Sequence, residues 1–292
     1  MTSSAVRRFN MPGEDDLGAR VITNLSGLAI SLLPNGGLFA IEHRHKRGRT
    51  RLNLVEGSPL DSGIARLYLR VRAPEPALTM AAGANADIRF GANVDRFVWR
   101  GATKDVRHDV SLWLHPRQPL WLWRMDIVND GTEAVACDAL LVQDLGLGER
   151  GFLMSNEAYA SQYIDHHIAR HPECGPVVMS RQNLAQRGSH PWVAHGCFEG
   201  AAGFATDAMQ LFGPAYRDGG ELDPRVELPS QRLQHEFACP VIQSAAASLE
   251  PGARAGWTFF GLYEPDHAEP SSDADLARID AAKKGRGRLY GA

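Results

Sequence analysis

A dense group of polar, aromatic and imidazole side chains lies between residues 151 and 192. Three motifs supply most of them: NEAYASQYIDHH at residues 156–167, MSRQN at residues 179–183 and HPW at residues 190–192. Amide, carboxylate and guanidinium groups can hydrogen-bond adjacent sugar hydroxyls in pairs, and aromatic faces can cover the apolar side of a sugar ring. The segment therefore indicates a carbohydrate site carried on loops.

Candidate sugar contacts in this segment are of two kinds. The planar or charged groups that would bind hydroxyls are Asn156, Glu157, Gln162, Asp165, Arg181, Gln182 and Asn183. The aromatic rings that would cover sugar faces are Tyr159, Tyr163 and Trp192. The alternative is a structural role, because Asn and Asp side chains commonly form turns and cap strands through local hydrogen bonds. The sequence leaves both interpretations open.

Metal binding is the next chemistry to consider, because the chain has 11 histidines. Adjacent side chains of a strand point to opposite faces, so His166 and His167 would not converge on one ion. The spacing of cysteines and carboxylates matches no familiar zinc or iron pattern. We predict no metal site.

Other catalytic motifs are absent or incomplete. The sequence has neither a GxSxG elbow nor the phosphate-binding pattern GxxxxGK[ST]. Residues 146–151 (GLGERG) fit GxGxxG after an expected strand, but no helix pattern follows, so a turn is predicted there. Asp144, Glu149, Glu157 and Asp165 could pair for glycoside cleavage, although spacing along the chain does not give their separation in space.

Composition and charge exclude several classes of protein. With 31 basic and 34 acidic side chains, the 292-residue chain has a net charge of −3, which does not favour nucleic acid or an anionic membrane as partner. We interpret the basic run at residues 43–51 as a solvated turn. The four cysteines form no CxxC pair and are expected to be buried, reduced thiols. No apolar run reaches the ~18 residues of a membrane span, so a cytoplasmic location is expected.

Strand patterns dominate the chain. Residues 27–33 and 38–43 predict a hairpin around the turn Pro34-Asn35-Gly36-Gly37, whose glycines permit positive φ. A four-stranded antiparallel meander is expected at residues 96–100, 106–114, 120–128 and 132–143, with Trp113, Trp121 and Trp123 packed in the core or between sheets.

Further strands and one helix are expected towards the C-terminus. The strands are predicted at residues 203–211, 232–248 and 257–263, and the helix at residues 274–282, capped by Ser271-Ser272-Asp273. Residues 283–292 have no periodic pattern and are expected to begin a linker.

Several motifs in one order resemble a known family. They are LNL at residues 52–54, SPLD at 58–61, LYLR at 67–70, QDLGL at 143–147, the three motifs described above, and the pairs Asp266-His267 and Ser271-Ser272. Together they resemble the N-terminal β-sandwich of glycoside hydrolase family 94 phosphorylases. The resemblance covers residues 27–280 and is closest to 1,2-β-oligoglucan phosphorylases and the phosphorylase-like region of cyclic β-1,2-glucan synthases.

The resemblance implies an all-β, mainly antiparallel fold: a large galactose-mutarotase-like supersandwich with a short C-terminal helix. It divides the chain into a tail or first strand at residues 1–20, the sandwich at residues 21–268 and the start of a helical linker at residues 269–292. In the family an (α/α)6 barrel follows and carries the catalytic Asp. We expect this barrel, and with it every catalytic residue, to be absent from the chain.

The same resemblance implies a supporting role in an inverting phosphorylase that splits β-1,2-linked glucooligosaccharides with inorganic phosphate. Phosphate is the co-substrate of the full-length enzyme, and no cofactor is expected. The expected partners are the glucan, the barrel and a second copy in a homodimer. The side chains expected to reach the sugar or the barrel are Tyr163, Asp165, His166, Arg181, Gln182, Asn183, His190 and Trp192.

Two alternatives remain open at this point. The first is a free-standing epimerase of the mutarotase type, in which His166 with Glu157 or Asp165 moves protons at the anomeric centre. The second is a non-catalytic carbohydrate-binding module, for which the tryptophans of residues 106–128 are the best feature.

Overall fold

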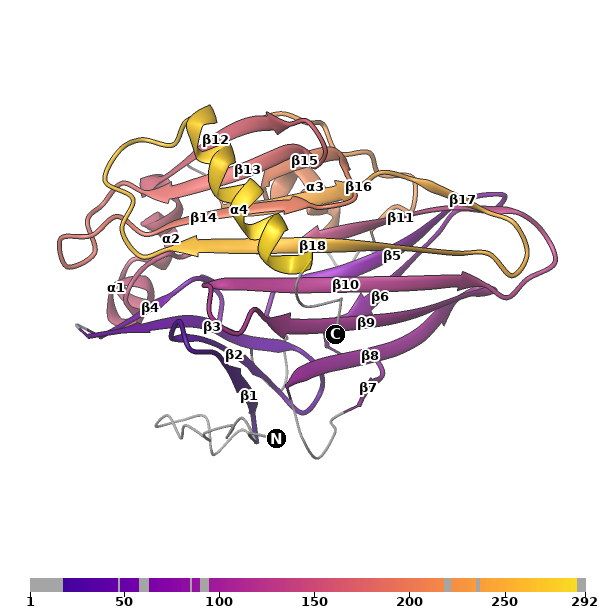
Figure 1. Ribbon diagram of the computed structural model, residues 1–292, viewed down its shortest axis with the longest axis horizontal. Helices are drawn as coiled ribbons and strands as arrows, with labels where there is room; N and C mark the ends of the chain where they lie inside the picture. The colour runs from indigo at the N-terminus through magenta and orange to yellow at the C-terminus, as the bar shows by residue number, and fades with distance from the viewer. Residues whose placement is uncertain are drawn as a thin grey trace.

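The computed structural model describes residues 18–46, 48–57, 63–84, 86–89, 95–217, 222–234 and 237–287. The whole SPLD motif and most of the expected N-terminal tail lie outside these ranges. Antiparallel pairing joins all the described strands, and helices are short and few compared with them (Figure 1).

Three sheets build the molecule. The largest has eight strands in the order β12 (Ile164–His171), β13 (Gly175–Gln182), β14 (Trp192–Cys197), β18 (Arg254–Glu264), β10 (Leu120–Asn129), β9 (Val106–Leu114), β8 (Arg96–Thr103) and β7 (Ile88–Arg89). The second has six, in the order β15 (Ala201–Asp207), β16 (Ala238–Ser244), β11 (Val135–Val142), β5 (Arg66–Ala73) and β6 (Ala77–Ala82), with β17 (Ala247–Leu249) also paired to β11. The third has four: β1 (Arg20–Thr23), β2 (Leu28–Leu32), β3 (Leu38–His45) and β4 (Gly48–Arg51).

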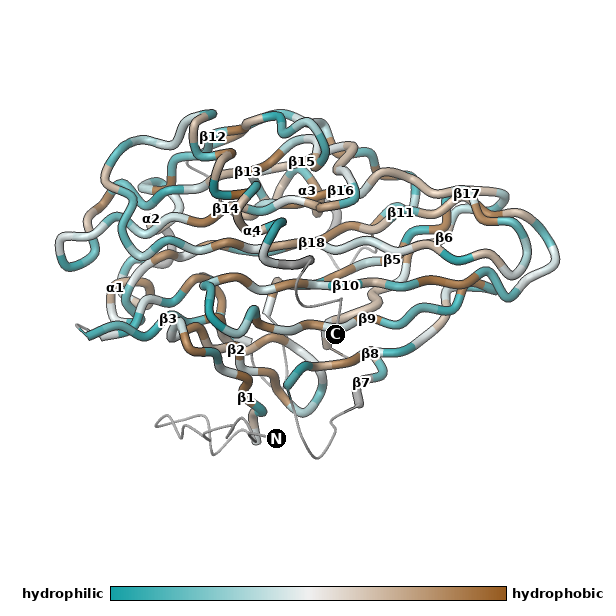
Figure 2. Tube along the Cα trace, in the orientation of Figure 1, coloured by the Kyte–Doolittle hydropathy of each residue, from teal (hydrophilic) through white to brown (hydrophobic). Residues whose placement is uncertain are grey.

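The eight-stranded sheet is apolar on its inner face and, from β10 to β13, on its outer face too, so strand alternation divides the side chains between two cores. On β10, Trp121 and Trp123 belong to the main core inside the sandwich, whereas Leu120 and Leu122 belong to a second core on the outer face. Helix α4 (Leu276–Gly287) covers this outer face and buries Ile279 and Ala282 there (Figure 1). In Figure 2 the brown, hydrophobic parts of the chain follow strands such as β2, β8 and β10.

The predicted N-terminal hairpin is confirmed. β2 pairs with β3 antiparallel, and the Leu33 N–H donates to the Gly37 carbonyl at 2.9 Å. Gly36 has a φ of 85°, the left-handed conformation that the turn requires. The basic run that follows is not a solvated turn, however: it forms the end of β3 and β4, and Arg51 is buried against Glu42 at 2.8 Å.

The predicted meander is correct for three strands and wrong for the fourth. β8, β9 and β10 pair in succession, but β11 crosses to the six-stranded sheet and pairs with β5 and β16. In place of the single strand expected at residues 232–248, the chain forms two strands, β16 and β17, with a break between them. The strand expected at residues 203–211 is β15, which ends at Asp207.

Several short helices were not predicted from the sequence. Near residue 150 they are α1 (Arg150–Ser155), α2 (Glu157–Ala160) and the 3-10 turn η2 (Ser161–Tyr163), and α3 (Met209–Arg217) follows later in the chain. α1 therefore begins within the GLGERG motif, at Arg150, although the sheets around it are antiparallel and form no dinucleotide-binding unit. Residues 164–182, expected as loops, form the β12–β13 hairpin.

The predicted fold class is confirmed as a large, mainly antiparallel β-sandwich with a short C-terminal helix. Ser272 and Asp275 form a reciprocal capping box that starts η3 (Asp273–Asp275), and α4 continues from it to Gly287. The helix therefore extends into residues that were expected to form a linker.

Candidate functional site

The eight predicted contact residues fall into three groups and do not all converge on one site, although the first two groups meet where Arg181 donates to Asn183 and lies opposite Asp165. Alternation along β12 and β13 separates neighbours such as Arg181 and Gln182 onto opposite faces of the sheet. The three groups are an outward-facing group at one end (Tyr163, Asp165, Asn183), a group on the outer face of the eight-stranded sheet (Arg181, His190, Trp192) and an interior group (His166, Gln182).

Exposed apolar side chains gather around the first group. Among the described residues six large apolar side chains are exposed, and four of them lie on α1, α2, η2 and the β13–β14 loop: Met154, Tyr159, Tyr163 and Leu184. The Asn183 N–H donates to the Tyr163 carbonyl at 2.7 Å, which joins the loop to η2. We call these four side chains and Asn183 the end surface. Such a concentration of exposed apolar groups is typical of a binding surface.

The two tyrosines of the end surface lie on one short helical segment. Ala160 and Ser161 both have right-handed helical φ and ψ, so α2 runs into η2 without a break. Tyr159 and Tyr163 are 58% and 41% exposed. Exposed phenol rings offer apolar faces on which a sugar ring can stack.

Charged and amide groups border these rings. Asn183 is exposed and accepts a hydrogen bond from Arg181 Nη1 at 2.5 Å. Asp165 lies 4.0 Å from Arg232 Nη1, which also donates to the His166 carbonyl at 2.9 Å. The side chain of Glu157 is outside the described part of the chain.

The second group holds the C-terminal segment. Arg181 donates from Nε to the His267 carbonyl at 2.7 Å and from Nη2 to the Ala268 carbonyl at 2.8 Å. Trp192 donates from Nε1 to Ser271 Oγ at 2.9 Å. His190 accepts from the His267 N–H at 2.8 Å and donates its own N–H to Asp266. We call residues 266–287, which these contacts anchor, the C-terminal strap.

The interior group is closed off from solvent. His166 is 2% exposed, and its Nδ1 lies 2.8 Å from Ser180 Oγ. Gln182 is fully buried and donates to the Gly146 carbonyl at 3.3 Å. His195 lies on the same face, its ring edge-to-face with Trp121 at 5.6 Å. Burial, with a smaller contribution from the charge of His166, lowers the pKa of His195 to about 3.

The carboxylates of residues 144–165 do not form a free acid–base pair. Asp144 is buried and accepts the N–H groups of Leu54 and Val55 at 2.9 and 2.7 Å. Burial raises the pKa of Asp144 to about 6, although those hydrogen bonds oppose the shift. Glu149 forms an ion pair with Arg187. Each described carboxylate of this set thus has at least one partner within the chain.

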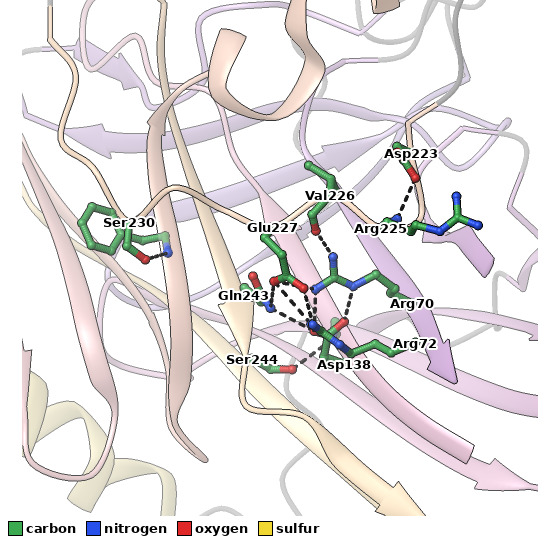
Figure 3. A network of polar contacts seen from close by, with 12 residues as sticks. Arg70, Arg72, Asp138, Asp223, Arg225, Val226, Glu227, Ser230, Gln243 and Ser244 are labelled. Carbon is green, nitrogen blue, oxygen red and sulfur yellow. Dashed lines mark hydrogen bonds and ion pairs between the residues drawn. The ribbon is translucent and has the colours of Figure 1, made fainter. Parts of the chain in front are cut away.

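A charged network that the sequence did not reveal lies on the six-stranded sheet (Figure 3). Arg70 of β5 donates to both carboxylate oxygens of Asp138 on β11, at 2.7 and 2.6 Å, and both side chains are buried. Arg72 and Gln243 also donate to Asp138, at 2.7 and 3.0 Å. Arg70 further donates to the Val226 carbonyl, so the network fixes the loop around Val226 against the sheet. The only signal of this network in the sequence was the set of arginines at alternate positions in and around LYLR.

The described residues show neither a metal centre nor a membrane-crossing helix. In that part of the chain, no group of three or more His, Cys, Asp or Glu side chains has a geometry that could hold a metal ion. None of the helices there combines the length and apolar character that crossing a membrane requires. The four cysteines are free and buried, as predicted, and burial raises the pKa of Cys137 and Cys174 to about 11.

Comparison with known proteins identifies the family. The model of the SOGP N-terminal domain matches residues 31–261. The chain belongs to this family. The chain is 30% identical over 234 residues to a 1,2-beta-oligoglucan phosphorylase of Listeria innocua serovar 6a. The match covers 80% of this chain but only 20% of that relative. The predicted family resemblance is therefore confirmed.

Solved structures share the fold of the SOGP N-terminal domain. A polysaccharide lyase overlays with a TM-score of 0.52 at 11% identity, over 82% of this chain and 33% of its own. A bacterial glucoamylase in complex with acarbose overlays with a TM-score of 0.50 at 10% identity, over 91% and 34%. A galactose mutarotase-related enzyme from Lactobacillus acidophilus gives 0.44 at 11% identity, over 87% and 100%.

Proposed function

We propose that the chain is the N-terminal domain of an inverting β-1,2-glucooligosaccharide phosphorylase, which converts glycan and inorganic phosphate to glucose 1-phosphate. In this proposal the domain shapes the substrate cleft and takes part in a homodimer. The observation that carries it is the match to the Listeria 1,2-beta-oligoglucan phosphorylase, which spans 80% of this chain and only 20% of that protein. A helical barrel outside the sandwich would supply the catalytic acid.

The contacts inside the sandwich support a non-catalytic role. A general acid for glycoside cleavage must reach the glycosidic oxygen. Asp144 is fully buried, while Glu149 and Asp165 face the guanidinium groups of Arg187 and Arg232. The chain alone is therefore expected to be inactive, and no residue of it is proposed as catalytic.

The end surface is the proposed place of contact with the glucan. Tyr159 and Tyr163 would stack on successive glucose units, and the carboxamide of Asn183 would bind a hydroxyl beside them. Arg181, His190 and Trp192 act instead through the C-terminal strap, whose position on the sheet they fix. Asp165 lies at the border of the end surface.

A binding titration tests this assignment. β-1,2-linked glucooligosaccharides would be titrated into the chain by NMR, and Tyr163→Ala is expected to weaken binding by about tenfold, or about 1.4 kcal/mol. Leu25→Ala is the matched control, because Leu25 is exposed and apolar but belongs to the β1–β2 turn. Equal losses for the two variants, or unchanged affinity in Tyr163→Ala, would remove the end surface from the proposal.

A simple carbohydrate-binding module is the second candidate, favoured by the same exposed tyrosines. Such a module would bind oligosaccharides tightly by itself, whereas the proposed domain binds weakly without its barrel. The mutarotase alternative has less support, since His166 is buried and hydrogen-bonded to Ser180. Polarimetry of glucose anomerisation tests it, with His166→Ala as the variant that should abolish any activity.

A further inference from the structure

The buried guanidinium of Arg181 connects the C-terminal strap to the end surface. Arg181 is 7% exposed. Its Nε and Nη2 donate to the carbonyl oxygens of His267 and Ala268, at 2.7 and 2.8 Å, and its Nη1 donates to the Asn183 carboxamide at 2.5 Å. A guanidinium is planar and rigid. Because the strap carbonyls hold two of its nitrogens, they also fix the direction in which the third nitrogen donates.

The contact with Arg181 determines how the Asn183 carboxamide is oriented. Guanidinium nitrogens only donate, so the carboxamide atom that faces Nη1 must be the oxygen, Oδ1. The Nδ2 amino group, with its two N–H donors, lies on the other side of the carboxamide. None of the described residues accepts a hydrogen bond from Nδ2, and Asn183 is exposed. The half of the carboxamide that Arg181 leaves free therefore consists of donors.

The backbone of Asn183 is bonded to a residue that carries an exposed ring. The Asn183 N–H donates to the Tyr163 carbonyl at 2.7 Å, and Tyr163 is 41% exposed. A sugar stacked on an aromatic face has its hydroxyls at the edge of the sugar ring, where a neighbouring amide can donate to them. The positions of Tyr163 and Asn183 suit this combination of a face and a donor.

We propose that Asn183 determines specificity by donating from Nδ2 to a hydroxyl oxygen of the glucan, and that Arg181 is the positioning residue that holds the carboxamide in this orientation. The inference rests on the proposed function of the end surface and adds to it the atom that meets the sugar. The carbonyls of His267 and Ala268 hold the guanidinium, so the docked strap preorganises the end surface for its ligand.

The orientation can be tested without sugar, by ¹⁵N relaxation of the side-chain amide groups. In the wild type the Nδ2 group of Asn183 should be rigid, with an order parameter of about 0.85, and in Arg181→Met it should fall below about 0.6. Gln186 is the internal control. Its carboxamide accepts the Glu149 N–H at 3.3 Å and donates to the Leu184 carbonyl at 3.1 Å, so it should stay as ordered as in the wild type. Unchanged order at Asn183, or an equal loss at Gln186, would overturn the positioning role.

The donor role can be tested by titrating β-1,2-linked glucooligosaccharides of the sophorose series into the variants by NMR. Asn183→Asp keeps an acceptor for Arg181 but removes both N–H donors, so affinity should fall about tenfold while the amides of α4 keep their protection from hydrogen exchange. Arg181→Met should lower affinity by a similar factor. The double variant Arg181→Met with Asn183→Ala should lose no more than Asn183→Ala alone, because Arg181 acts through Asn183. Unchanged affinity in Asn183→Asp, or additive losses in the double variant, would contradict the proposal.

Ser271→Ala separates this role from a general loosening of the strap. Ser271 accepts the Trp192 Nε1–H at 2.9 Å, so the variant weakens the strap and leaves the contacts of Arg181 in place. The amides of α4 should lose protection in Ser271→Ala and in Arg181→Met, whereas glucan affinity should fall only in Arg181→Met. Equal losses of affinity would refute the positioning role. A wild type that binds no glucooligosaccharide would overturn the proposed function together with the donor role, whereas failure of the sugar-free experiment alone would overturn only the positioning by Arg181.

Discussion

Asp144 and His195 are both fully buried in the sandwich, and burial shifts their pKa values in opposite directions. The carboxyl group becomes a weaker acid, with a pKa raised to about 6, and the imidazole becomes a weaker base, with a pKa lowered to about 3. In both cases burial penalises the charged form. The two residues should therefore make opposite contributions to the pH dependence of stability.

Replacing Asp144 by Asn should remove a loss of stability at high pH. Because the folded pKa is raised, the contribution of Asp144 is complete below the unfolded pKa and is lost as the pH rises through about 6. Between pH 5 and pH 8 the wild type should lose about 1.4 kcal/mol relative to Asp144→Asn. Urea unfolding at the two pH values measures this difference, and parallel profiles would refute the assignment.

Replacing His195 by Gln should have the opposite effect. The folded pKa of His195 is lowered to about 3, so the wild type should lose stability as the pH falls below about 6.5, where the unfolded chain takes up a proton. From pH 7.5 to pH 5 this loss should be about 2 kcal/mol and should be absent in His195→Gln. Thermal or urea unfolding of both proteins across this range is the measurement. Retention of the full acid-induced loss by the variant would contradict it.

Single residues were partly predictable from the sequence. Adjacent positions in a strand face opposite ways, and His166 is indeed buried while His167 is partly exposed. Arg181 and Trp192 were chosen as sugar or interdomain contacts, a role that stays a prediction. Their observed partners are His267, Ala268 and Ser271, which lie 79 or more positions away along the chain. Periodicity carries no information on such distant pairings.

At the scale of elements, the Arg70–Asp138 pair ties β5 to β11 and both strands to the loop around Val226. Replacing Asp138 by Leu leaves Arg70 buried without its partner and should destabilise the fold by about 3–5 kcal/mol. The double variant Arg70→Met with Asp138→Leu should recover most of this loss, because neither charge remains. Urea unfolding of the single and double variants measures both values.

An exposed ion pair serves as the control for this prediction. Arg100 and Asp109 face each other on β8 and β9 at 2.9 Å and are about half exposed. Arg100→Ala should change stability by less than about 1 kcal/mol.

A double variant on Arg70 and Asp138 that is no more stable than Asp138→Leu alone would contradict the prediction, because it would show that the buried pair itself stabilises the sheet.

Elements set by local sequence were the predictable ones. The Pro34–Gly37 turn and the β8–β9–β10 meander depend on residues close in sequence, and both were found. The transfer of β11 to another sheet was not predictable, because the alternation of its side chains is the same in either sheet. α1 and α2 were not predicted because they are too short to show a helical period in the sequence.

At the scale of the whole molecule, the fold class and the family were predicted correctly. The residues expected to form one loop-borne site are instead distributed over the sandwich. The sandwich distributes the polar residues of 151–192 between the end surface, the strap contacts and the interior. The expectations on membrane, metal and domain organisation stay predictions. We propose that the β-sandwich offers the end surface to a glucan and the C-terminal strap to a helical barrel.

The release of glucose 1-phosphate tests this account most directly. The purified chain would be incubated with inorganic phosphate and β-1,2-linked glucooligosaccharides of the sophorose series, and the products separated by chromatography. We expect no glucose 1-phosphate above the protein-free blank, because in the proposed function a separate barrel supplies the bond-breaking acid. Phosphate-dependent release that scales with the concentration of the chain would contradict the central claim.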